Sequence, residues 1–167
     1  MSEQVTSPSM VIEVVPTVST SPAYTAEDQV GGIQTLTSAC RSKGAGATLI
    51  SLTVHDAGKQ SAALTVFFFD ELPTVASVDN GAITITDAEM ADKCIGTISL
   101  TAANYVNVAG SSIVTAPASS TGLYMKSKTD KVSGAASGNL YAVVKTTGTP
   151  TYASTTDLTF RYSFIQD

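Results

Sequence analysis

The clearest alternation of apolar and polar residues lies between residues 48 and 70. In the run 48–56 every second residue is apolar, which places three apolar side chains on one face: Ile50, Leu52 and Val54. A period of two is typical of a strand with one buried face. A short polar segment containing Gly58 separates this run from the apolar run 64–70. We therefore predict that the two runs pair as an antiparallel hairpin.

The second run is apolar on both faces. Leu64, Val66 and Phe68 share one face, and Phe67 and Phe69 lie on the other. A strand of this kind is typical of the middle of a sheet, covered from both sides. One sandwich core can cover only one of these faces. A second cover is therefore expected over Phe67 and Phe69, from a loop of the same chain or from another copy.

Strand patterns recur along the rest of the chain, and one helix is predicted near residues 87–93. Thr86 and Glu89 have the spacing of a capping box, in which Thr86 caps the helix and Glu89 reaches back to the Thr86 amide. The further strand candidates are residues 10–15, 32–39, 81–86, 94–100, 104–108, 112–115, 122–127, 140–145 and 157–165. Adjacent Gly31 and Gly32 indicate a bulge or a close backbone approach, because no helix or Lys follows them as a phosphate loop requires.

These elements predict an all-β fold. Roughly nine to eleven strands with one short helix favour two packed antiparallel sheets, a β-sandwich of the jelly-roll-like kind. The 167 residues fit one domain. We place that domain at residues 10–167, after a flexible N-terminal arm of residues 1–9 that is polar and contains a proline.

Charge and cysteine content narrow the classes of partner. The net charge is −5 and the pI is about 4.7, which argues against nucleic acid as a partner. Lys126, Lys128 and Lys131 form the one local basic group, which fits a solvated strand end better than a phosphate site. No secretory signal and no run near the ~20 apolar residues of a membrane span is present. A reducing cytosol is expected, with Cys40 and Cys94 as small buried side chains, although a disulfide between them stays open.

The sequence offers few groups for catalysis, and we expect no enzyme, cofactor or metal site. His55 and Asp56 are neighbours on a strand, so their side chains should point to opposite faces. Asp70 and Glu71 could supply paired carboxylates, but the chain has no Trp to form a sugar platform. Two sets of candidate metal ligands lack the spacing of known sites: Cys40, Cys94 and His55 for zinc, and Asp87, Glu89 and Asp92 for calcium.

Three segments taken together resemble a family of phage proteins. They are Ala23–Gly32, then Ser51–Asp56 leading to Leu64–Asp70, and then Asp79-Asn80 with Ile85–Glu89 and Ile95-Gly96. In this order and spacing they resemble small head proteins of tailed bacteriophages, encoded beside the major capsid protein. The resemblance covers about residues 23–100, with Glu27 standing where the family often has Gly.

The resemblance implies a virion component made in the host cytoplasm. Most directly, it implies a capsid cement (decoration) protein with a β-sandwich fold. Such a protein binds the major capsid protein on the outer surface of the head. A tail or baseplate component of the same virion is the alternative within this class. A carbohydrate-binding β-sandwich module is the alternative from another class, against which the few aromatic residues argue.

The second apolar face of the run 64–70 suggests self-association. If another copy covers Phe67 and Phe69, these residues form an oligomer interface, and cyclic symmetry lets each copy bury its patch without open growth. The resemblance implies three copies, because cement proteins commonly occupy capsid threefold positions. We therefore expect a homotrimer.

Overall fold

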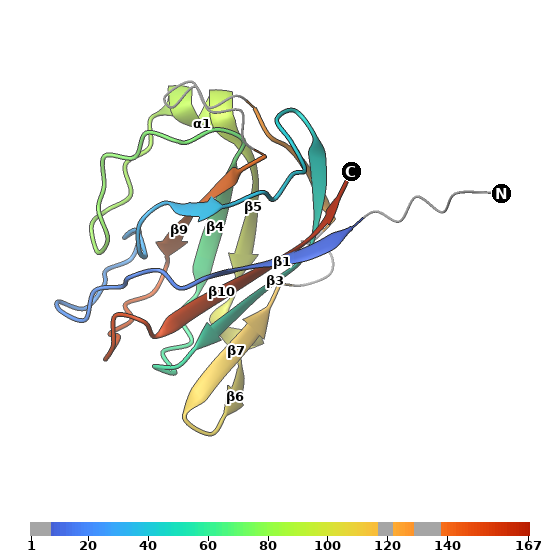
Figure 1. Cartoon of the computed structure of the whole chain (residues 1–167). Helices are drawn as coiled ribbons and strands as arrows, with labels where there is room; N and C mark the ends of the chain where they lie inside the picture. The colour runs from blue at the N-terminus through green and yellow to red at the C-terminus, as the bar shows by residue number, and fades with distance from the viewer. Residues whose placement is uncertain (1–7, 117–121, 129–137) are drawn as a thin grey trace.

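The computed structural model describes residues 8–116, 122–128 and 138–167, and it is built from two antiparallel sheets (Figure 1). The first sheet runs β1 (Ser9–Val14), β10 (Leu158–Gln166), β3 (Gly46–Asp56), β7 (Ser111–Thr115) and β6 (Val106–Val108), and β8 (Leu123–Lys126) also pairs with β3. The second sheet runs β2 (Gln34–Leu36), β9 (Leu140–Thr146), β4 (Leu64–Phe69) and β5 (Cys94–Leu100). The predicted all-β sandwich with one short helix is confirmed.

The strand order is that of a jelly roll. Strands β1, β10, β3 and the β7–β8 pair form one sheet, and β2, β9, β4 and β5 form the other, so the chain crosses between the sheets repeatedly. Strands β7 and β8 pair in tandem with the two ends of β3, at Thr53–Asp56 and at Gly46–Leu49 respectively. Together they occupy the place of a single strand beside β3, and β6 extends the sheet at that edge.

The predicted hairpin between residues 48–56 and 64–70 is wrong. Strand β3 pairs with β10, β7 and β8 in the first sheet, whereas β4 pairs with β5 and β9 in the second. The segment between them is a corner that carries the chain from one sheet to the other. Both runs have the correct period, but local alternation does not encode the partner of a strand.

The register of β3 also differs from a simple alternation. The pairing with β10 shifts between Ser163 and Phe164, so that Leu49 points to the core and Ile50 is exposed. Such a bulge inserts one extra residue and exchanges the faces on its two sides. The prediction of a buried face is therefore confirmed for Leu52 and Val54 and is wrong for Ile50.

The main core lies between the sheets and contains most of the large side chains. Phe68 of β4 meets Tyr162 of β10 edge-on with ring centroids 6.0 Å apart, and Phe160 stacks on Tyr162 at 6.2 Å. The buried Tyr162 hydroxyl donates to Gln34 Oε1 of β2 at 2.6 Å. Burial of the aromatic rings supplies the main driving force, and the hydroxyl keeps a partner.

A second, smaller core covers the outer face of the second sheet. Phe69, Tyr141 and Val143 are buried there under Leu72, Val75, Ile83, Ile85 and Met90. All five covering residues belong to residues 71–93, which we call the cover segment. Figure 1 shows this segment in green and yellow-green, and it includes α1 (Asp87–Lys93). It lies next to the second sheet, on the side of β9, β4 and β5.

The helix begins as predicted, with one difference in its cap. Thr86 accepts from the Glu89 amide at 3.2 Å, but the Glu89 carboxylate accepts from the Thr74 amide at 3.0 Å instead of bonding back to Thr86. Lys93 also pairs with Glu89 at 2.8 Å. The predicted strand 81–86 is a single bridge between Ala82 and Asp28. The bonds of Glu89 hold the cover segment together, and the bridge joins it to the segment before β2.

The boundary of the predicted arm shifts. Ser9 belongs to β1 and faces Ile165, and the Pro8 carbonyl accepts from the Gln166 amide at 3.0 Å. These two residues are therefore part of the domain. Residues 1–7 of the predicted arm lie outside the described residues.

Candidate functional site

The candidate catalytic residues at the end of β3 point apart. His55 is half-buried on the outer face of the first sheet, whereas Asp56 is fully buried on the inner face. This is the arrangement expected for neighbouring strand residues. His55 therefore has no carboxylate of Asp56 to orient its ring, and the pair does not form a catalytic dyad.

Asp56 lies instead at the corner between the two sheets. Its Oδ2 accepts from the Ser61 amide at 2.7 Å, and further amides of the corner loop point toward the carboxylate. Its Oδ1 accepts no hydrogen bond from the residues that the structure describes. Burial raises the pKa of Asp56, while the surrounding amides act in the opposite direction. The carboxylate organises the turn from β3 to β4, at the cost of burying a charge.

Neighbouring tyrosines share this buried corner. Burial, together with the charge of Asp56, raises the pKa of both Tyr105 and Tyr152. The Tyr152 hydroxyl, like Asp56 Oδ1, makes no hydrogen bond within the described residues. Both hydroxyls therefore stay protonated at neutral pH.

Asp56→Asn should stabilise the protein more as the pH rises. Because the pKa of Asp56 is raised in the folded state, its contribution to stability is present below the unfolded pKa of ~3.9 and is lost as the carboxyl ionises. Asparagine keeps an acceptor for the Ser61 amide, carries no charge and puts a donor in the place of Oδ1. We expect a small difference between variant and wild type at about pH 4, growing toward pH 7, in denaturant unfolding at several pH values. A difference that does not change with pH would contradict the buried-charge account.

The candidate pair of carboxylates, Asp70 and Glu71, is buried in the structure. Asp70 and Glu71 follow β4 and are 5 % and 3 % exposed. Lys128 pairs with Asp70 at 3.2 Å, and its ammonium also donates to the Asp92 carbonyl at 2.6 Å. Burial raises the pKa of Asp70, and Lys128 opposes that rise. This arrangement joins the end of β4, α1 and the segment after β8.

The predicted basic group is divided by these contacts. Lys128 takes part in the pair with Asp70, and Lys126 is exposed at the end of β8. Lys131 lies outside the described residues. Both cysteines are free thiols, Cys40 buried and Cys94 half-buried, so the disulfide that the sequence left open is not formed. Within the described residues, no three of the His, Cys, Asp and Glu side chains gather as a metal site would require.

The predicted interface at Phe67 and Phe69 is covered by the chain itself. Phe69 is 0 % exposed and lies in the small core beneath the cover segment. Phe67 is half-buried and lines a shallow hollow of about 150 Å³ with Ile83, Ile85 and Met90. Of the two covers that the sequence left open, the structure has the loop of the same chain. The exposed apolar patch on which the expected homotrimer rested is therefore reduced to part of the Phe67 ring.

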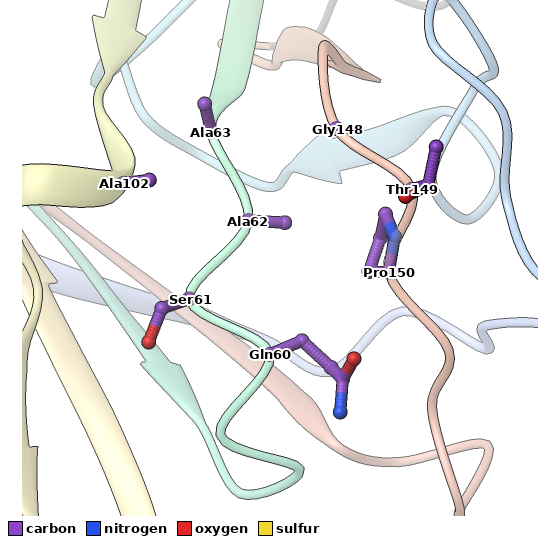
Figure 2. A pocket seen from close by; sticks show the side chains of 8 residues that line it. All are labelled: Gln60, Ser61, Ala62, Ala63, Ala102, Gly148, Thr149 and Pro150. Atoms are coloured by element: carbon purple, nitrogen blue, oxygen red, sulfur yellow. The ribbon is translucent and has the colours of Figure 1, made fainter.

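A larger pocket lies at the end of the second sheet, between the segment before β4 and the segment after β9 (Figure 2). Its volume is about 270 Å³, slightly below the ~300–1,000 Å³ of typical ligand sites. The lining residues are mostly small: Ala62, Ala63, Ala102, Gly148, Thr149 and Pro150, with Gln60 and Ser61.

The polar side chains of this pocket hold its walls together. Gln60 Oε1 accepts from the Thr151 amide at 3.1 Å, and Gln60 Nε2 donates to the Gly58 carbonyl at 3.1 Å. The Ser61 hydroxyl donates to Ser112 at 3.0 Å. Two of the three polar side chains of the lining, those of Gln60 and Ser61, are thus already bonded within the protein.

The outer face of the first sheet exposes several large apolar side chains. Seven large apolar side chains in the described part of the chain are 42–73 % exposed, and six of them lie on or next to this sheet: Val11, Val15, Ile50, Val106, Val108 and Tyr124. Val78, in the cover segment, is the seventh. The sequence analysis missed this surface. The sequence of each strand shows which residues share a face. It does not show which face stays uncovered, because that depends on where the cover segment folds.

Comparison with known proteins adds no relative. No protein-family model matches the sequence, and a search of curated proteins found no significant match. No helix in the described ranges is long and apolar enough to cross a membrane. A proposal for the function of this chain therefore rests on its own residues and their geometry.

Proposed function

We propose that this chain is a capsid cement protein of a tailed bacteriophage, which binds the major capsid protein on the outer surface of the head. The observation that carries this proposal is the spatial grouping of two of the segments that resemble the phage family. Tyr24 donates its hydroxyl to Asp79 Oδ1 at 2.6 Å, and the Gly31 amide donates to the same oxygen at 2.5 Å. The Gln29 and Asn80 backbones are also joined, at 2.9 Å.

These contacts join segments far apart in sequence into one structural unit. Asp79 and Asn80 lie in the cover segment, which packs over Phe69 of β4. Two of the segments that carry the resemblance, Ala23–Gly32 and Asp79-Asn80, are therefore neighbours in the fold, whereas Ser51–Asp56 lies on β3 in the first sheet. A match of scattered surface residues would give no such grouping.

The fold is compatible with this role. Jelly rolls occur in viral capsid proteins and in lectins, although a fold by itself does not fix a function. A net charge of −5 keeps a protein soluble and disfavours binding to nucleic acid. The cover segment packs on the second sheet, so that it and the sandwich can contact capsid subunits as one unit. We propose major capsid protein and further copies of the chain as partners, with the homotrimer implied by the resemblance as the expected assembly.

Adding the purified chain back to heads that lack it tests the proposal. Heads should be prepared from the encoding phage with this gene inactivated, and occupancy measured by image reconstruction of the particles. We expect regular density on the head surface and a higher temperature of DNA release than in undecorated heads. Density on the tail or baseplate instead would favour the alternative virion role. Binding to a glycan array, with no density on the virion, would favour a carbohydrate-binding module.

A further inference from the structure

The two sheets differ in how far their outer faces are covered. The second sheet is covered by residues 71–93, which bury Phe69, Tyr141 and Val143. Six of the seven exposed large apolar side chains lie on or next to the first sheet, and no element among the described residues packs on its outer side. We call the outer side of the first sheet the open face.

Strand register places the residues of the open face in three rows. The first row joins Val11, Ser163 and Ser51, and the second joins Glu13, Arg161, Thr53 and Thr115. The third joins Thr159, His55, Ile113 and Val106. Directly paired residues of antiparallel strands point to the same side. Val11 and Val106 therefore lie at opposite corners of the face, and most residues between them are Ser or Thr.

The open face carries few charges. Glu13 and Arg161 at its centre pair at 2.9 Å, and Lys126 is exposed at its β8 edge. The Thr53 and Thr115 hydroxyls bond to one another at 3.1 Å. By contrast, α1 and its N-cap region carry Asp87, Glu89 and Asp92, and the whole chain has a net charge of −5.

We propose that copies of this chain associate with one another through the open face. Two chains of charge −5 repel each other, and contact through a face with few charges keeps the acidic residues of α1 out of the interface. Because the Glu13–Arg161 pair holds one charge of each sign, two facing copies can arrange their pairs in complementary order. A second copy therefore fits this face in both apolar character and charge.

The size of the open face is sufficient for such a contact. Five strand positions spaced ~4.8 Å apart, with strands of 3 to 11 residues, give a face on the order of 600 Å². A standard specific interface covers about 800 Å² per partner, so association of moderate affinity is expected. This inference does not depend on the proposed capsid role and can be tested with the purified chain alone.

Sedimentation velocity of the purified chain across about 1–100 μM tests the proposal. Wild type should self-associate, beginning with a dimer of two facing copies. The double variant Val11→Glu/Val106→Glu adds charge at opposite corners of the face and should weaken association at least about tenfold. In ~1 M salt, where the screening length falls from ~10 to ~3 Å, much of the association should return, which damage to the fold would not allow.

Val78→Glu is the matched control, because Val78 is the most exposed of the seven side chains and lies away from the open face. It should leave association unchanged, and thermal unfolding of all variants should stay close to wild type. A wild type that is monomeric at 100 μM would overturn the proposal. Equal weakening by Val78→Glu, or loss of association through Phe67→Ser with no effect of the double variant, would also overturn it.

Discussion

Replacing Phe68 by alanine should lower the free energy of unfolding by about 3–5 kcal/mol, the usual cost of truncating a large aromatic in a packed core. Phe68 is fully buried, stands on a strand with partners on both sides and meets the Tyr162 ring edge-on. Its removal leaves a cavity that strands β4, β5 and β9 are too constrained to fill. Urea unfolding followed by fluorescence measures the change.

The neighbouring residue provides the control for this change. Phe67 is on the opposite face of β4 and is only half-buried, at the edge of the hollow beneath the cover segment. Phe67→Ala should therefore cost distinctly less than Phe68→Ala. If the two variants unfold at the same denaturant concentration, the assignment of Phe68 to the main core is wrong.

Gly31→Ala should destabilise the protein by about 2–4 kcal/mol. Gly31 has a φ of +70°, a conformation that costs an L-residue ~1–2 kcal/mol. In addition, a Cβ at this position would lie 2.6 Å from Pro16 Cβ, so the backbone must move. That movement also disturbs the amide that donates to Asp79.

Gly32→Ala is the matched control for this effect. No atom lies within 4 Å of the position that its Cβ would take. The variant should lie within about 1 kcal/mol of wild type in the same thermal or denaturant unfolding experiment. Similar losses in both variants would mean that the close approach to Pro16 does not determine the effect.

Several local features could be predicted from the sequence because neighbouring residues encode them. The alternation in residues 158–164 places Leu158, Phe160, Tyr162 and Phe164 in the core, as the structure confirms. The spacing of Thr86 and Glu89 gave the start of the helix. The glycine pair gave the close approach at Gly31. Each of these features depends on residues only a few positions apart.

The surface proposed for self-association could not be predicted in the same way. The sequence suggested an interface at Phe67 and Phe69, because a strand with two apolar faces needs two covers. The second cover is part of the same chain, between residues 71 and 93. Once those residues fold over the second sheet, the outer side of the first sheet is left uncovered, and the candidate interface moves there.

The sequence by itself determined the class of fold, the helix and most of the inward-facing residues, since period, caps and glycines act over short distances. Only the tertiary structure decided that β3 and β4 lie in different sheets and that Ile50 turns outward at a bulge. It also decided that Asp56 is buried at the corner. These features arise from contacts between residues far apart in the chain, where many pairings satisfy the same alternation. Packing of the whole core selects one of them.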